Sequence, residues 1–86
     1  MNYTVKVARP AEKFLRGLTD KKLYRRIHKV IDGLELQPRP TDCVKLKGLD
    51  ELYRVRVGDY RIVYQIQDQQ LFVLVIQIGH RREIDR

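Results

Sequence analysis

Residues 51–66, ELYRVRVGDYRIVYQI, decide the fold, because two short alternating segments flank the dipeptide Gly58-Asp59. Gly-Asp is typical of the two-residue loop that closes a tight β-hairpin. With this loop, Arg56 lies opposite Arg61. The other cross-strand pairs are then Val57 with Tyr60, Val55 with Ile62 and Tyr53 with Tyr64. Alternation then places the apolar and aromatic side chains on one face: Tyr53, Val55, Val57, Tyr60, Ile62 and Tyr64. We predict that this face belongs to the core.

The opposite face of the same hairpin carries three arginines, Arg54, Arg56 and Arg61. Arg56 and Arg61 are direct cross-strand neighbours, and like charges in that position cost up to about 1 kcal/mol. One interpretation is a binding site for a phosphate, whose oxygens match the fixed forks of guanidinium groups. The other is a solvated basic face whose guanidiniums spread into water. The hairpin alone does not decide between them.

Two amphipathic helices are predicted before the hairpin. Pro10 suits the first turn of the first helix, and Gly17 lies near its end. Thr19 or Asp20 can cap the second, longer helix. His28 lies at the margin of the second apolar stripe and is interpreted as a boundary residue. The two stripes have helical spacing: Ala11, Phe14, Leu15 and Leu18, then Leu23, Ile27, Val30, Ile31 and Leu34.

Three further segments complete the fold. Tyr3–Val7 alternates and predicts a first strand, and two prolines within residues 37–42 stop the second helix. Residues 70–78, QLFVLVIQI, are apolar at both parities, which predicts a strand covered on both sides or nearly so. The order is therefore β-α-α-β-β-β, an α+β fold in one domain spanning residues 1–86. A helical hairpin packs on one face of a small, mainly antiparallel sheet, and the arginines lie on the other.

Composition narrows the partners and the setting. A formal net charge of +7 and a sequence pI near 9.9 favour a polyanion, either nucleic acid or an acidic protein. The one cysteine, Cys43, excludes an internal disulfide and a Cys-based zinc site, and fits a reducing, cytoplasmic setting. No spacing resembles a metal site, and no cofactor is expected. The longest apolar run, residues 71–76, is too short to span a bilayer, and the N-terminus lacks a signal-peptide core.

Other candidate residues each carry two interpretations. Five cations follow the polar side of the second helix: Lys21, Lys22, Arg25, Arg26 and Lys29. They are either a footprint for an RNA backbone or the solvated side of an amphipathic helix. His80, at the end of the last strand, is either an acid or base near neutral pH or a surface residue. Cys43 lies in a proline-bounded loop without a paired histidine and is interpreted as inert.

The hairpin and its flanks resemble a known family. The segments KLKGLDELYRVRVGDYRIVYQI (45–66) and IGHRREI (78–84) resemble the RelE toxins of the RelE/ParE superfamily. The likeness extends over nearly the whole chain, and its most specific parts are Tyr-basic-x-basic at 53–56, Gly-Asp-Tyr-Arg-x-x-Tyr at 58–64 and Gly-basic-Arg at 79–81. It implies the toxin of a type II toxin–antitoxin system. Such a toxin is a metal-independent endoribonuclease, or mRNA interferase, that cleaves mRNA in the ribosomal A site and inhibits translation.

The resemblance also implies roles for the arginines. In the family's reaction the ribose 2′-OH attacks the adjacent phosphate, the 5′-oxygen leaves and a 2′,3′-cyclic phosphate remains. Arg54 and Arg56 match the paired basic positions of the active strand. Arg61 matches the arginine that stabilises the phosphate transition state, and Arg81 the arginine near the leaving group. Because arginine does not release a proton near neutral pH, Arg54 and Arg56 are interpreted as electrostatic stabilisers, and the general base stays unassigned.

The tail departs from the family pattern. A tyrosine that stacks on a base and transfers a proton is expected there, and Asp85 stands in its place. Asp85 is either natural, with His80 or Asp85 itself handling protons, or was introduced to detoxify the protein. Aspartate does not stack and adds negative charge beside the phosphate, so we expect weak or no cleavage. Besides the helix cations, three residues match the surfaces that meet ribosomal RNA: Lys45, Lys47 and Arg82.

The implied partners are a RelB-like antitoxin with an acidic patch, the ribosome and mRNA. Operator DNA is reached only through the antitoxin, and no membrane is involved. Two alternatives stay open: a ParE-type toxin that inhibits DNA gyrase, and a non-catalytic module that binds only the antitoxin or nucleic acid. Gyrase inhibition does not need Arg54, Arg56, Arg61 and Arg81. The presence of these four arginines therefore disfavours the ParE-type alternative. Cleavage of RNA without the ribosome is a narrower variant of the endoribonuclease function.

Overall fold

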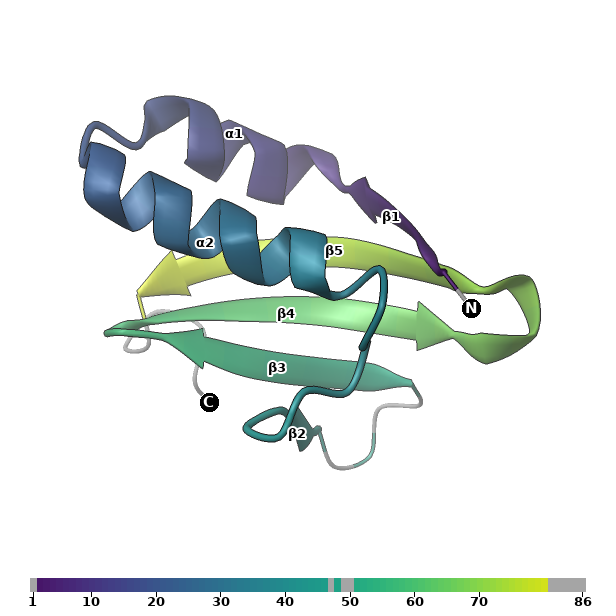
Figure 1. Ribbon diagram of the computed structural model, residues 1–86. Coiled ribbons are helices and arrows are strands. Elements are labelled where there is room, and N and C mark those ends of the chain that lie inside the picture. The colour runs from purple at the N-terminus through teal and green to yellow at the C-terminus, as the bar shows by residue number, and fades with distance from the viewer. Residues whose placement is uncertain (1, 47, 49–50, 81–86) are drawn as a thin grey trace.

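The computed structural model describes residues 2–46, 48 and 51–80 (Figure 1). The elements follow in the order β1 (Thr4–Val7), α1 (Arg9–Gly17), α2 (Lys21–Gly33), β2 (Val44–Lys45), β3 (Leu52–Val57), β4 (Tyr60–Gln67), a 3-10 turn (Asp68–Gln70) and β5 (Phe72–His80). Figure 1 shows both helices against one side of the sheet. The predicted α+β order is confirmed, with one addition: the two-residue β2, where the sequence predicted only a basic lead-in to the hairpin.

The strands form one mixed sheet in the order β1-β5-β4-β3-β2. β1 runs parallel to β5, and the other three pairs are antiparallel. In the hairpin of β3 and β4, Arg56 pairs with Arg61 and Tyr53 with Tyr64, as the two-residue loop predicted. Gly58 has a φ of +61°, the left-handed conformation that this turn needs and that glycine adopts without strain. One local dipeptide thereby sets the register of the whole hairpin.

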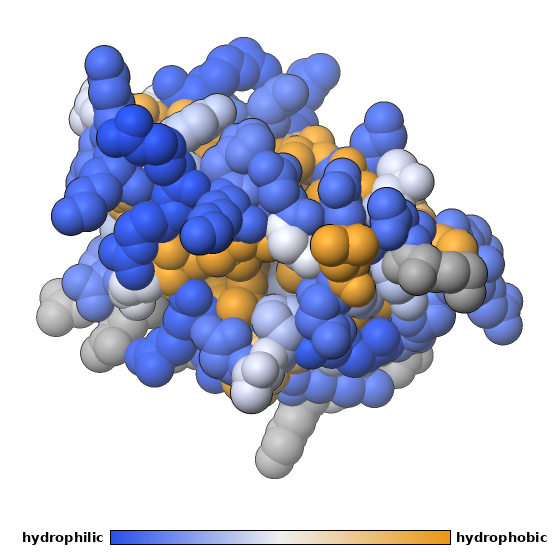
Figure 2. Space-filling view, viewed as in Figure 1, coloured by the Kyte–Doolittle hydropathy of each residue, from blue (hydrophilic) through white to orange (hydrophobic). Residues whose placement is uncertain are grey.

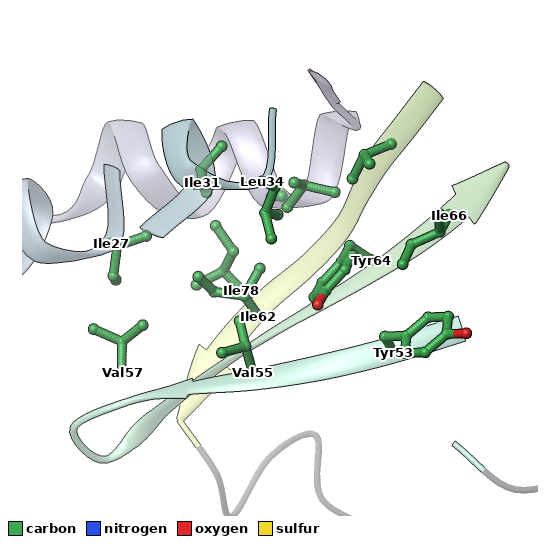
Figure 3. Close-up of a cluster of buried hydrophobic side chains, with 13 residues drawn as sticks. Ile27, Ile31, Leu34, Tyr53, Val55, Val57, Ile62, Tyr64, Ile66 and Ile78 are labelled. Carbon is green, nitrogen blue, oxygen red and sulfur yellow. The ribbon is translucent and has the colours of Figure 1, made fainter. Parts of the chain in front are cut away.

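The core lies between the two helices and the sheet, and Ala11 of α1 is fully buried in it. The Asp20 side chain caps α2 by accepting a hydrogen bond from the Leu23 N–H at 3.1 Å, as predicted. Ile27 points from α2 toward Val57 of the hairpin, as Figure 3 shows, and Ile31 belongs to the same buried cluster. Each fully buried aliphatic side chain in such a core stabilises the fold by about 1.5–3 kcal/mol relative to exposure. No helix in the described ranges is long and apolar enough to cross a membrane.

A β-bulge interrupts β5. The register with β4 shifts between Val63 and Tyr64, which leaves Ile76 as an extra residue on β5. As a result Val75 and Ile78 both pack into the core, although they stand three positions apart. The residues between them are not covered to the same extent: Ile76 is half-buried and Gln77 is exposed. The predicted cover of this strand is therefore complete only on its helix side.

An ion pair fastens the segment between α2 and β2 to the end of the sheet. Arg39 donates two hydrogen bonds to the Asp68 carboxylate, at 3.1 and 2.8 Å. Its Nε donates to the Tyr53 hydroxyl at 3.2 Å, and its guanidinium carbon lies 5.1 Å from the centroid of that ring. The Tyr3 hydroxyl donates to the same carboxylate at 2.7 Å. We call this cluster of Tyr3, Arg39, Tyr53 and Asp68 the Arg39 clasp.

A buried hydroxyl reinforces the same segment. Tyr64 is fully buried, and its hydroxyl donates to the Pro38 carbonyl at 2.9 Å. Burial raises the pKa of the Tyr64 phenol, so it stays protonated and keeps this bond. In the clasp, the hydrogen bonds from Arg39 and Tyr3 lower the pKa of Asp68 below its ordinary value. Near neutral pH the Tyr64 hydroxyl is therefore protonated and the Asp68 carboxylate charged, as the hydrogen bonds to this segment require.

Candidate functional site: the arginine face of the hairpin

The hairpin places Arg54, Arg56 and Arg61 on the face of the sheet away from the helices. Arg56 stands directly across from Arg61, and Arg54 lies on the same face, two residues before Arg56 on β3. Cross-strand neighbours in an antiparallel pair have Cβ atoms about 4.5–5.5 Å apart, so two long side chains can reach one small anion. The structure thus brings together three of the predicted site residues.

The two paired arginines differ in exposure. Arg56 is exposed, whereas Arg61 is only 6% exposed, which the sequence did not predict. Arg61 lies on a central strand, and its ladder neighbours are Arg56 on β3 and Gly79 on β5. Gly79 has no side chain, so the position beside Arg61 leaves room for the guanidinium. Because guanidinium keeps its proton when buried, Arg61 holds a fixed positive charge within this face.

The bulge in β5 determines where His80 lies. Tyr60 pairs with His80 in the register between β4 and β5, so both side chains lie on the helix side of the sheet. Their rings meet edge to face with centroids 5.4 Å apart, and Tyr60 contacts the Phe14 ring of α1 at 5.7 Å. The structure therefore places His80 on the opposite face from the three arginines. A sequence reading with unbroken alternation gives the other face, because it misses the bulge.

The cations of α2 are all exposed: Lys21, Lys22, Arg25, Arg26 and Lys29. Figure 2 shows the hydrophilic side chains that cover the helix layer. Arg26 has a second role, because its Nη1 lies 3.5 Å from the place where a Cβ on Gly58 would stand. It thereby covers the hairpin turn. Lys45 is exposed and pairs with Tyr53, so it lies on the helix side of the sheet edge and not beside the arginines.

Four predicted site residues lie outside the described residues: Lys47, Arg81, Arg82 and Asp85. Cys43 is a half-buried thiol without a disulfide. In the described part of the chain, no group of three or more His, Cys, Asp or Glu side chains is arranged to hold a metal ion.

The chain resembles known proteins over nearly its full length. Residues 5–85 match the family model described as the ParE toxin of type II toxin–antitoxin system, parDE. The chain belongs to the RelE/ParE toxin superfamily. It is 30% identical to the putative toxin RelE1 of Methanocaldococcus jannaschii over 84 residues, which cover 94% of this toxin and 92% of that protein.

Two further comparisons place the toxin nearer to RelE. The mRNA interferase toxin RelE of Escherichia coli K12 is 36% identical over 55 residues, which cover 62% of this chain and 56% of that protein. The archaeal RelE–RelB complex from Pyrococcus horikoshii OT3 contains a chain that superposes with a TM-score of 0.82 at 34% identity. That match covers 94% of this toxin and 97% of that chain. The toxin therefore has a RelE-like fold.

Sequence reasoning missed two features of this face and its surroundings. The first is the glycine beside Arg61. The sequence shows the motif at 79–81, but only the bulge in β5 makes Gly79 the ladder neighbour of Arg61. The second is the Arg39 clasp, whose partners Arg39 and Asp68 are 29 positions apart. An arginine between two prolines, at 38–40, is the only local signal of the clasp in the sequence.

Proposed function

We propose that this toxin inhibits translation by cleaving mRNA in the ribosomal A site, as a metal-independent endoribonuclease. The observation that carries the proposal is the cross-strand pair of Arg56 and Arg61 with Arg54 beside it. Like charges directly across a ladder repel each other by up to about 1 kcal/mol, and a phosphate placed between them is attracted to both guanidiniums. The name of the Escherichia coli relative, an mRNA interferase, supports the same reaction class.

The proposed reaction forms one bond to phosphorus and breaks another, with one proton transfer at each oxygen. The ribose 2′-oxygen gives its proton to a base and attacks the adjacent phosphorus. The bond from phosphorus to the 5′-oxygen breaks, that oxygen takes up a proton, and a 2′,3′-cyclic phosphate remains. Arg56 and Arg61 stabilise the negative charge that grows on the non-bridging oxygens, and Arg54 adds to the positive potential. None of the three is the base, because guanidinium does not lose its proton near neutral pH.

The remaining steps depend on residues outside the described ranges and on the ribosome. By resemblance, Arg81 stands near the leaving oxygen, and Asp85 stands where a tyrosine stacks and transfers a proton. The ribosome contributes by holding the mRNA bent toward in-line attack. With Asp85 in the tyrosine position, we expect this chain to cleave weakly or not at all.

The cations of α2 support contact with ribosomal RNA, together with Lys45, Lys47 and Arg82. Lys21, Arg25 and Lys29 are spaced four residues apart on an exposed helix side. Like charges at this spacing destabilise a helix by about 0.2–0.5 kcal/mol for each pair. A polyanionic partner offsets that cost, and the mRNA-bound ribosome is such a partner.

An antitoxin is the proposed regulatory partner. The Pyrococcus horikoshii relative forms a RelE–RelB complex, and we extend a RelB-like antitoxin to this chain. Because burying the arginine face requires paired charges, the antitoxin presents carboxylates or a helix C-terminus near Arg56 and Arg61. In this proposal the toxin acts in the cytoplasm, where its ribosome is, and reaches operator DNA only through the antitoxin.

A second candidate function is inhibition of DNA gyrase without RNA cleavage. One observation favours it: the family model that matches residues 5–85 is named for ParE. The hairpin arginines argue against it, because a gyrase inhibitor has no phosphate transition state to stabilise.

Primer extension on mRNA in programmed ribosomes with an empty A site tests the proposal. The purified toxin is compared with its Asp85→Tyr variant, and each is also added to a gyrase supercoiling assay. We expect the tyrosine form to cut at the A-site codon and the chain itself to cut weakly or not at all. Equal cutting by both forms would contradict the assigned role of the tail. Cutting by neither, with gyrase inhibited, would replace the proposal by the second candidate.

A further inference from the structure

A cavity lies between the two helices and the edge strand β1. Its volume is about 370 Å³, and ligand pockets in proteins commonly have volumes of about 300–1,000 Å³. Val5 and Val7 of β1, Leu15 of α1 and Ile31 of α2 supply its apolar walls. Figure 1 shows α1 and α2 side by side on one face of the sheet. The cavity therefore lies on the helix side, away from the arginine face.

Charged side chains line the same cavity. Three of them are carboxylates, Glu12, Asp32 and Glu35, and one is a guanidinium, Arg16. Glu12 accepts a hydrogen bond from Arg16 on its own helix at 2.7 Å. Asp32 Oδ2 lies 3.1 Å from Nδ1 of His28, one turn earlier on α2. The carboxylates thus outnumber the guanidinium, although the chain as a whole has a net charge of +7. This local sign favours a cationic ligand.

Glu35 is the carboxylate with capacity to spare. Its main chain is fixed, because its carbonyl accepts from the Tyr3 N–H at 2.7 Å and its own N–H donates to the Asp32 carbonyl at 3.2 Å. Its side chain is exposed, and among the residues that the structure describes none forms a hydrogen bond or ion pair with it. A carboxylate is therefore held beside the cavity with its oxygens open to a ligand.

The end of α2 adds an independent argument for a cation. Asp32 lies in the last turn of α2 and Glu35 just beyond it, where the helix dipole has its negative end. No basic residue lies in that turn. Negative side chains are unfavourable at this end of a helix, and a cation is attracted both to them and to the dipole. The position of the charges and their sign therefore favour the same class of ligand.

A flat aromatic surface favours guanidinium over ammonium. The rings of Tyr24 and His28, which both line the cavity, stack with centroids 5.8 Å apart and an angle of 27° between their planes. Tyr24 is 38% exposed, so a ligand can reach it. A planar guanidinium stacks on aromatic rings and donates to a carboxylate through a rigid fork, whereas an ammonium is a compact, strongly hydrated charge. The methylene stem of such a ligand packs on apolar walls.

We propose that this cavity binds an alkylguanidinium, with its stem on the apolar walls and its head between Tyr24 and the carboxylates of Asp32 and Glu35. This is the chemistry of an arginine side chain, carried either by a basic peptide segment or by a free small molecule. Because the cavity and the arginine face lie on opposite sides of the sheet, this ligand does not compete with a phosphate. The inference does not depend on RNA cleavage.

An NMR titration of the ¹⁵N-labelled toxin tests the proposal. The probe is N-acetyl-arginine amide, compared with the citrulline compound, in which a neutral urea group replaces the guanidinium, and with the lysine compound. We expect the arginine compound to shift the amide signals of residues 5–7 and 28–35 and to bind at least about tenfold more tightly than the citrulline compound. Equal binding of these two would overturn the proposal. Equal binding of the lysine compound would overturn the assignment to a guanidinium.

A second titration distinguishes the two sources of the ligand. It compares the capped peptide Gly-Gly-Arg-Gly-Gly with agmatine, a free alkylguanidinium. Tighter binding of the peptide would assign the cavity to a protein segment, and tighter binding of agmatine to a small molecule. Binding of neither would overturn the proposal.

Two carboxylates offer matched variants. Glu35 lines the cavity, and Asp42 is an exposed carboxylate outside it. Glu35→Gln is expected to weaken binding of the arginine compound by about threefold or more, and Asp42→Asn to leave it unchanged. If both variants melt like the parent and bind the compound equally, the cavity is not the site.

The aromatic ring gives a further readout. Tyr24→Ala removes the stacking surface and should weaken binding of the arginine compound by about threefold. Tyr24→Phe keeps the ring and should bind like the parent. Parent-like binding by Tyr24→Ala would contradict the stacked position of the guanidinium.

Discussion

Arg39 and Arg56 show two uses of one side chain within the same small sheet. Arg39 donates to a carboxylate and a hydroxyl and lies over a tyrosine ring, so its partners come from this chain. The ladder neighbour of Arg56 is another arginine. The first arrangement stabilises the fold, whereas like charges directly across a ladder are unfavourable to each other. The contrast separates an arginine that the fold uses from one that we propose for function.

The largest expected effect is on catalysis. In the Asp85→Tyr background, Arg61→Ala should lower the single-turnover rate of mRNA cleavage by about 10²–10³, as loss of one charged stabiliser does. Arg39→Ala is the matched control, because it removes an arginine that lies away from the arginine face. It should lower the melting temperature and leave the rate per folded molecule unchanged. If the two variants lose activity equally, the contrast between Arg39 and the arginine pair of the hairpin is wrong.

The next effect concerns the segment between α2 and β2 that the Tyr64 hydroxyl contacts. Tyr64→Phe removes a buried hydroxyl and leaves the Pro38 carbonyl without its donor, which should lower the free energy of unfolding by about 1–3 kcal/mol. Urea unfolding measures the change. Tyr24→Phe is the control, since Tyr24 is exposed and lies on α2. A similar loss in both variants would show that Tyr64 does not fasten this segment through its hydroxyl.

A smaller effect of opposite sign is expected at the arginine pair. Arg56→Gln relieves the repulsion from Arg61 and should raise the free energy of unfolding by up to about 1 kcal/mol at low salt. The gain should shrink as ionic strength rises, because salt screens the exposed guanidinium. Arg39→Gln should destabilise the toxin under the same conditions. Destabilisation by Arg56→Gln at all salt concentrations would mean that Arg56 is a structural residue after all.

The smallest effect is a change in pH dependence at the clasp. Arg39 and Tyr3 lower the pKa of Asp68 in the folded state, so the unfolded chain binds this proton more readily. The clasp therefore stabilises fully above the ordinary carboxyl pKa of 3.8 and loses this contribution as the pH falls through the lower, folded value. Asp68→Asn should show a weaker decline in unfolding midpoint on acidification. An identical decline would assign the acid sensitivity to other carboxylates.

The sequence predicted what local patterns encode. Gly58-Asp59 set the hairpin register, and helical spacing with the Asp20 cap placed the second helix. Features that depend on distant pairing left no such pattern. The clasp joins Arg39 to Asp68 across 29 positions, and Arg61 is only 6% exposed on a strand that has a neighbour on each side. The arginine pair follows from the local turn and was predicted, whereas the Arg39 clasp depends on the fold and was not.

The bulge in β5 has a consequence for comparing relatives of this toxin. Because Ile76 is the extra residue in the ladder, a chain that lacks it would keep every pairing from Tyr60 to Tyr64 with the same neighbours on β5. A one-residue gap at this position in an alignment therefore leaves these strand pairings unchanged. The number of residues between the start of β5 and the motif at 79–81 is therefore one more than the number of pairs in the ladder. An alignment that forbids the gap would place His80 instead of Gly79 beside Arg61, and would thereby assign a histidine to the arginine face, on which His80 does not lie.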